Sequence, residues 1–103
     1  MPGAFTYYPV TLTVTPTVVN PGSELTVSWT APAGQSEWDW VGLYKVGEPN
    51  TNMIWYEYTG TSSGSRKFAA PAQPGQYEFR YLVDDDFNEA ARAGPITVVA
   101  GSR

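Results

Sequence analysis

Short runs in which apolar and polar residues alternate recur along the whole chain, and they limit the possible fold more than any other feature. Residues 10–15, 25–30 and 76–82 alternate most regularly. A period of two places successive side chains on opposite faces, which is typical of a β-strand with one buried face. The sequence shows no sustained three-to-four-residue period of an amphipathic helix. The chain is therefore predicted to be all-β.

Proline, glycine, asparagine and serine separate the predicted strands. Asn20-Pro21-Gly22-Ser23 is a predicted tight turn, because proline presets one central φ and glycine accepts a positive φ at the next position. Further strands are predicted at residues 39–45, 53–58, 66–69 and 96–99, and loops at 31–36, 60–64 and 83–94. About seven short strands in 103 residues predict one antiparallel β-sandwich domain over residues 1–103, with an ordered core at about residues 8–100.

The second half of the chain favours an immunoglobulin-like (Ig-like) sandwich. Tyr77 follows Gly75 where such folds place a tyrosine whose hydroxyl bonds back to the preceding backbone. Phe79 stands at the position of the second core cysteine, and Val27 would be its partner across the core. Because the chain has no cysteine, an apolar Val27–Phe79 contact is expected in place of a disulfide. A small closed barrel is the alternative architecture.

The predicted core follows from the alternation and from one spacing. Trp40 comes thirteen residues after Val27, near the spacing of the core tryptophan in Ig domains. Residues 39–45 are apolar on both sides, as in a central strand covered on both faces. The pattern therefore leaves open whether Trp40 or Val41 points inward. The predicted core residues are Val27, Trp29, Trp40, Tyr77, Phe79 and Tyr81.

Composition and charge argue against several classes of function. The net charge of −4, with no basic cluster, disfavours binding to nucleic acid, which needs a basic surface. The absence of histidine and cysteine removes the commonest general base and the thiol nucleophile. No run of about eighteen apolar residues occurs, so no membrane span is expected. The chain is predicted to be neither an enzyme nor a cofactor-binding protein.

The acidic residues allow two further hypotheses. Paired carboxylates could support glycoside hydrolysis; the candidates are Glu37, Asp39, Glu57 and residues 84–86. Solvated surface acids explain these residues more simply. Asp84, Asp86 and Asn88 also alternate as oxygen ligands of a Ca²⁺ loop would. Phe87 stands where such a loop prefers a small residue, so a solvated acidic hairpin tip is the preferred interpretation.

The aromatic run at residues 55–58 is the strongest functional indication. Alternation places Trp55 on one face and Tyr56 and Tyr58 on the other, and Trp38 adds a ring just before the strand at 39–45. Exposed aromatic rings stack on sugars and dominate protein–protein hot spots. The alternative is that these rings cover the core at a sheet edge. The candidate binding residues are Trp38, Trp55, Tyr56 and Tyr58.

Residues 39–47, Asp-Trp-Val-Gly-Leu-Tyr-Lys-Val-Gly, resemble the first motif of the SKICH family. Residues 77–81 match the family's later Tyr-x-Phe-x-Tyr strand, and residues 95–98 match its closing Pro-aliphatic strand, so the resemblance covers roughly residues 10–99. Glu48 departs from the family, which often has an aromatic residue there. The resemblance implies an Ig-like sandwich used for protein interaction and localisation.

Two other groups of accessory domains share parts of this pattern. The Thr- and Pro-rich first strands are similar to bacterial surface Ig-like modules, and the Asp-Trp-Val-Gly stretch is similar to one in the N-terminal sandwich domain of purple acid phosphatases. The first and last residues, 1–4 and 101–103, are expected to be the edges of a domain from a longer protein. The sequence does not fix the compartment, although an extracellular or cell-surface location is favoured.

Together these features predict a non-catalytic binding, interaction or spacer module of a larger multidomain protein, with a protein as its partner. The alternative is a carbohydrate-binding module that recognises a glycan through exposed aromatic residues around Trp55.

Overall fold

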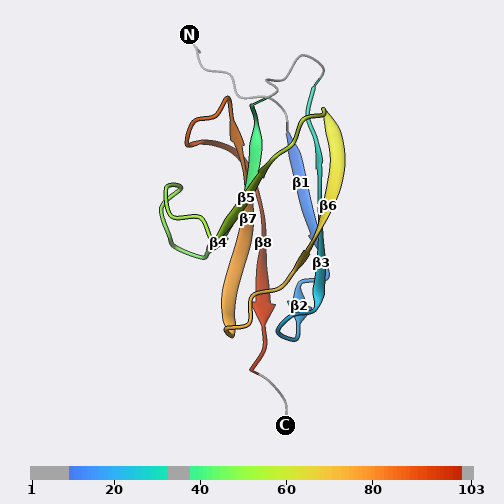
Figure 1. The fold of residues 1–103 in the computed structure, drawn as a ribbon, viewed down its shortest axis with the longest axis vertical. Helices are drawn as coiled ribbons and strands as arrows, with labels where there is room; N and C mark the ends of the chain where they lie inside the picture. The colour runs from blue at the N-terminus through green and yellow to red at the C-terminus, as the bar shows by residue number, and fades with distance from the viewer. Residues whose placement is uncertain (1–9, 33–37, 101–103) are drawn as a thin grey trace.

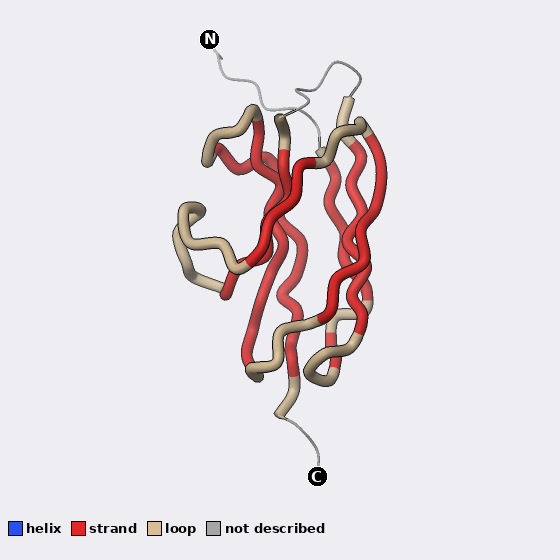
Figure 2. The backbone as a smooth tube through the Cα atoms, viewed as in Figure 1, coloured by secondary structure: helices blue, strands red, loops and turns tan. Residues whose placement is uncertain are grey.

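The computed structural model describes residues 10–32 and 38–100, which form two β-sheets packed as layers (Figure 1, Figure 2). The first sheet has the strand order β1 (Thr11–Thr15), β3 (Glu24–Thr30), β6 (Ser63–Ala69). The second has the order β2 (Val18–Val19), β8 (Asn88–Val98), β7 (Gly75–Val83), β4 (Trp40–Lys45), β5 (Trp55–Tyr58). The predicted all-β sandwich is confirmed. Within these described ranges, no helix is long and apolar enough to cross a membrane.

Almost every strand pair is antiparallel, as predicted. The exception is β2, which runs parallel to β8 through Val18 and Val19. Two residues are too few to produce an alternating pattern, so the sequence predicted about seven strands where the described residues form eight. β4 lies between β5 and β7, and its two faces contribute to two different clusters: Val41 and Leu43 to the core between the sheets, and Trp40 and Tyr44 to a second cluster. Burial of both faces explains why its sequence is apolar on both sides.

Parts of two segments predicted as loops belong to strands. β6 begins at Ser63, inside the predicted loop 60–64, and Gly64 pairs with Trp29 of β3. β8 begins at Asn88, inside the predicted loop 83–94, and pairs along the second half of β7. Both stretches consist of small and charged residues without apolar alternation. Their pairing comes from backbone hydrogen bonds, which a hydrophobic pattern does not report.

The main core lies between the two sheets. Its fully buried members include Val27 from β3, Leu43 from β4 and Phe79 from β7. Of the predicted core residues, this cluster contains Val27, Trp29, Tyr77, Phe79 and Tyr81. Trp40 is also buried but belongs to a second cluster, with Tyr44 and Leu82. Val41, not Trp40, therefore points between the sheets.

A tyrosine corner leads into β7. The Tyr77 hydroxyl donates a hydrogen bond of 2.6 Å to the carbonyl oxygen of Gln73, four residues earlier. Gly75, between them, has a φ of 155°, a value that L side chains rarely adopt. The hydroxyl contact expected from the sequence is therefore present, and it ties the start of the central strand to the preceding loop.

Candidate ligand-binding site

The outer face of the five-stranded sheet, turned away from the other sheet, carries a second layer of aromatic residues. Trp40 and Tyr44 of β4 and Leu82 of β7 form its buried part, and Met53 and Tyr58 pack against them. The β4–β5 connection, residues 46–54, and the β7–β8 turn, residues 84–87, lie on this side of the molecule (Figure 1). These two segments account for the burial of an otherwise open sheet face.

Gly42 makes the close approach of two of these rings possible. It lies between Trp40 and Tyr44 on β4, and a Cβ at this position would be 2.9 Å from Cε1 of Tyr44 and 3.1 Å from Cζ3 of Trp40. Any larger residue would push the rings apart. The Asp-Trp-Val-Gly-Leu-Tyr stretch therefore encodes a strand with an aliphatic inner face and an aromatic outer face.

Asn50 fastens the β4–β5 connection over this outer face. Its backbone carbonyl accepts a hydrogen bond of 2.7 Å from the Tyr44 hydroxyl, and its Oδ1 accepts one of 2.8 Å from Arg80. Its Nδ2 donates to the carbonyl of Phe87 at 3.0 Å. One side chain and its backbone thus join the sheet, the connection and the β7–β8 turn.

A buried ion pair lies beneath this connection. Glu78 and Arg80 occupy the face of β7 opposite Phe79, as alternation predicts, yet they are only 5% and 2% exposed. Oε2 of Glu78 lies 2.7 Å from one terminal guanidinium nitrogen of Arg80 and also accepts a hydrogen bond of 2.8 Å from Nε. The guanidinium carbon lies 4.1 Å from the centre of the Tyr44 ring, within cation–π range.

Tyr44 makes the stability of this region fall at alkaline pH. Burial raises the pKa of Tyr44 to about 12, against the opposing effect of Arg80. Because the unfolded chain releases this proton at about pH 10, the stabilisation from Tyr44 is complete below about pH 10 and is lost as pH rises to about 12.

The stability of the Tyr44→Phe variant lacks this dependence on pH, but the variant loses a hydrogen bond worth about 1 kcal/mol. We expect the stability gap between the two proteins, measured by urea unfolding, to narrow between pH 9 and pH 11.5; parallel curves would contradict the assignment.

Asp39 has a structural role, unlike the solvated acid predicted from the sequence. It is fully buried, and its Oδ2 accepts a hydrogen bond of 2.7 Å from the Tyr81 hydroxyl. Its Oδ1 accepts another, of 2.8 Å, from the backbone N–H of Asp84. Glu57, a second candidate acid, pairs with Arg66 at 2.6 Å. Glu37 lies outside the described residues.

The β7–β8 turn places its acidic residues differently from a calcium loop. Asp84 and Asp85 have φ values of 57° and 56°, and the N–H of Asp86 donates to the carbonyl of Val83 at 3.1 Å, as in a β-turn with positive φ at both central positions. Oδ1 of Asp86 accepts a hydrogen bond from the N–H of Phe87 at 2.7 Å, and Oδ2 one from the Asn88 amide at 3.5 Å. Across the described ranges, no three acidic, histidine or cysteine side chains gather as metal ligands.

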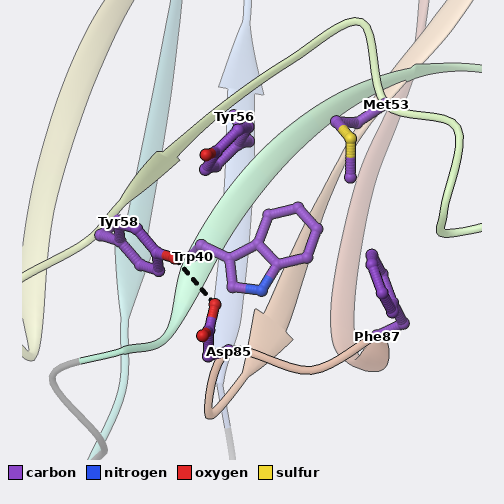
Figure 3. Close-up of a pocket in the computed structure, with 6 residues that line it drawn as sticks. All are labelled: Trp40, Met53, Tyr56, Tyr58, Asp85 and Phe87. Carbon is purple, nitrogen blue, oxygen red and sulfur yellow. Dashed lines mark hydrogen bonds between the residues drawn. The ribbon is translucent and has the colours of Figure 1, made fainter.

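A pocket of about 220 Å³ opens beside this turn. The six described residues that line it are Trp40, Met53, Tyr56, Tyr58, Asp85 and Phe87. Figure 3 shows the Trp40 indole at the centre, with the other five side chains around it. The Trp40 ring lies edge-to-face with Tyr56 and Phe87, at centroid distances of 5.6 and 5.8 Å. The Trp40 ring therefore forms the floor of the pocket, and the rings of Tyr56 and Phe87 form walls at steep angles to it.

Asp85 supplies the polar edge of the pocket. Its Oδ1 accepts a hydrogen bond of 2.7 Å from the Tyr58 hydroxyl (Figure 3), and this bond raises the pKa of Tyr58. The indole N–H of Trp40 donates to the carbonyl of Asp86 at 3.0 Å, which fixes the turn against the pocket floor. The pocket thus combines aromatic walls with one carboxylate.

The structure separates the four predicted binding residues. Trp38 and Tyr56 are about half exposed, at 51% and 52%, and Tyr58 lines the pocket, with its ring 5.5 Å from that of Trp38. Trp55 lies on the opposite face, where it packs against Phe68 and Phe79 of the main core. Met53, Asp85 and Phe87 were not among the predicted binding residues, because they come from loops whose position depends on the tertiary fold.

The described residues therefore define an Ig-like β-sandwich with an aromatic pocket on its outer face. Among solved structures, the fold is similar to the human OSCAR ligand-binding domain, with a TM-score of 0.57 and 25% sequence identity. The similarity covers 93% of this chain and 52% of that one. No protein-family model matches the sequence.

In sequence, the chain is similar to part of a group of fungal enzymes. It is 32% identical over 95 residues to phosphatidylethanolamine N-methyltransferase of Scheffersomyces stipitis, which covers 81% of this chain and 11% of the enzyme. It is 29% identical over 105 residues to the Schizosaccharomyces japonicus enzyme, covering 76% of this chain and 12% of the enzyme. The chain thus spans only about a tenth of the length of these relatives.

Proposed function

We propose that this chain is a non-catalytic ligand-binding module and that the aromatic pocket over Trp40 is its binding site. The observation that carries the proposal is the pocket itself, because Trp40, Tyr56, Tyr58 and Phe87 gather around one cavity outside the main core. Aromatic side chains that face a cavity with few polar groups are typical of small-ligand sites. The similarity to a domain described as ligand-binding supports the same interpretation.

The chemistry of the site supports binding without catalysis. The sequence contains no histidine or cysteine, and Asp85 is the single carboxylate among the six lining residues that the structure describes. Asp39, the nearest buried acid in sequence to Trp40, is occupied by hydrogen bonds from Tyr81 and Asp84. General acid–base catalysis by paired carboxylates would need a second acid in reach.

The module is proposed to serve a larger protein. The partial similarity to phosphatidylethanolamine N-methyltransferases, which are many times longer than the matched segment, supports an accessory position. By their name these enzymes act on an amine-bearing lipid. The SKICH-like stretch at residues 39–47 supports an interaction role, and it supplies the pocket floor, Trp40.

Glycan binding remains the alternative, supported by the exposed rings of Trp38 and Tyr56. Sugar-binding platforms present flat rings side by side for stacking. Here Tyr56 lies at 74° to Trp40 and at 88° to Tyr58, so these rings do not form a flat platform; they line a pocket. Trp55, the residue at the centre of the carbohydrate hypothesis, packs against the inter-sheet core. The geometry therefore supports a ligand that enters a pocket better than one that stacks on a surface.

The indole N–H resonances of the four tryptophans provide a test with an internal control. We expect at least one compound from a panel of amines, sugars and carboxylic acids to shift the Trp40 resonance in an NMR titration, while Trp29 stays unchanged. Tyr56→Leu, at a half-exposed position, should weaken this binding without unfolding the protein. The proposal fails if no compound shifts Trp40. A glycan-array signal that survives Tyr56→Leu but is lost in Trp55→Ala would favour the alternative.

A further inference from the structure

We propose that the pocket recognises a methylated ammonium group, with trimethylammonium as the best match; this inference rests on the pocket being the binding site. The chemical reason is that the site combines a cage of aromatic rings with one negative charge. Quaternary ammonium ions bind in such cages because the negative face of an aromatic ring attracts a cation.

The charge of the pocket favours a cation. Asp85 is the only charged side chain among the six described lining residues, and within the described ranges no lysine or arginine forms an ion pair with it. Asp84 and Asp86 flank it in the same turn. Arg80, on the same sheet face, is buried and compensated by Glu78. An anionic ligand would meet repulsion at this turn.

The rings are spaced so that one cation can contact several of them. The centroid of Trp40 lies 5.6 Å from that of Tyr56 and 5.8 Å from that of Phe87, and Tyr56 lies 5.9 Å from Tyr58. A cation placed between these rings would be within the approximately 6 Å range of cation–π attraction for more than one ring. Tryptophan, the most effective ring for this interaction, forms the floor.

The polar groups of the pocket favour a methylated ammonium over a primary one. A primary ammonium has three N–H donors and needs matching acceptors, whereas a quaternary ammonium has none and presents methyl groups to its surroundings. The lining offers few acceptors. One oxygen of Asp85 already accepts a hydrogen bond from Tyr58, and the side chains of Met53 and Phe87 are apolar. The volume of about 220 Å³, roughly seven water molecules at about 30 Å³ each, accommodates a trimethylammonium group.

The test is a calorimetric and NMR titration with tetramethylammonium, choline, ethanolamine and 3,3-dimethyl-1-butanol, the neutral analogue of choline. We expect choline and tetramethylammonium to shift the Trp40 indole resonance. The neutral analogue and ethanolamine should each bind at least about fivefold more weakly. Phosphatidylcholine vesicles distinguish the source of the group: binding to choline and vesicles indicates a lipid headgroup, and binding to choline alone indicates a soluble ligand.

The charge contribution is tested with Asp85→Asn and the matched control Asp84→Asn. Asparagine tolerates the positive φ found at both positions and can still accept the Tyr58 hydrogen bond. We expect Asp85→Asn to weaken choline binding by about fivefold and Asp84→Asn to weaken it by less than twofold. Equal losses in the two variants would overturn the proposed role of Asp85.

The outcomes also separate this inference from the proposed function. If the neutral analogue binds as tightly as choline, or if only uncharged compounds shift Trp40, the pocket is a binding site but not an ammonium cage. If neither these compounds nor the wider panel shifts Trp40, both proposals fail. Tyr56→Leu keeps an apolar side chain but removes one ring, so it should weaken the binding of choline more than the binding of the neutral analogue.

Discussion

Replacing Glu78 with glutamine is expected to lower the free energy of unfolding by about 3–5 kcal/mol. The side chains of Glu78 and Arg80 are only 7% and 3% exposed, so the substitution leaves the Arg80 cation buried without its anionic partner. The Tyr44 ring and the side-chain oxygen Oδ1 of Asn50 remain in contact with it and offset part of this cost. The measurement is urea denaturation at neutral pH, where the midpoint should fall with little change in slope.

A matched control is available in the same molecule. Glu57 and Arg66 form an ion pair of 2.6 Å, but their side chains are 43% and 41% exposed. Glu57→Gln should therefore cost less than about 1 kcal/mol. The double variant Glu78→Leu with Arg80→Met removes both buried charges and should recover most of the loss. If Glu78→Gln lowers the free energy of unfolding by no more than Glu57→Gln does, burial does not make the Glu78–Arg80 pair more important for stability than an exposed pair.

Local sequence patterns were sufficient to predict the sandwich and the position of its corner. The alternation at residues 76–82 places Tyr77, Phe79 and Tyr81 on one face, and all three belong to the main core. The glycine and tyrosine that form the corner are two residues apart in the sequence. A period of two and a tight turn involve only neighbouring residues, so a single sequence carries them completely.

The position of Trp40 could not be predicted in this way. Both faces of β4 are buried, so its sequence shows no polar side. Trp40 is covered by Tyr56 and by Phe87, which is 47 positions later in the chain. That cover depends on Asn50 joining the β4–β5 connection to the β7–β8 turn. The sequence therefore indicated an aromatic surface but not the pocket, because the pocket is assembled from segments that meet only in the folded chain.

The burial of Asp39, Glu78 and Arg80 was missed for a related reason. Charged residues are usually exposed, and alternation correctly placed Glu78 and Arg80 on the face opposite the main core. What alternation cannot report is that a loop covers this second face. In the described residues every buried polar side-chain atom has a hydrogen-bond partner. Covering this face therefore leaves no buried polar side-chain atom unsatisfied.

Replacing Phe79 with alanine is expected to destabilise the protein by about 3–5 kcal/mol, through lost burial and the cavity that remains. Phe79 is fully buried, and its ring contacts Trp55 and Phe68, at centroid distances of 6.2 and 6.5 Å. It occupies the position of the second core cysteine of Ig domains, and the chain has no cysteine to provide a covalent link. Such a loss is large for a domain of ordinary stability, which totals about 5–15 kcal/mol.

Phe68→Ala is the control, because Phe68 is only partly buried and lies on the edge strand β6. It should cost about 1–3 kcal/mol. Phe79 faces the main core, whereas the pocket lies on the opposite face of the five-stranded sheet. Folded Phe79→Ala protein, studied at low temperature, should therefore still show the ligand-dependent shift of the Trp40 resonance. Losing that shift while the sandwich remains folded would show that the pocket depends on inner-face packing, and the two faces of β7 could not then be treated as independent.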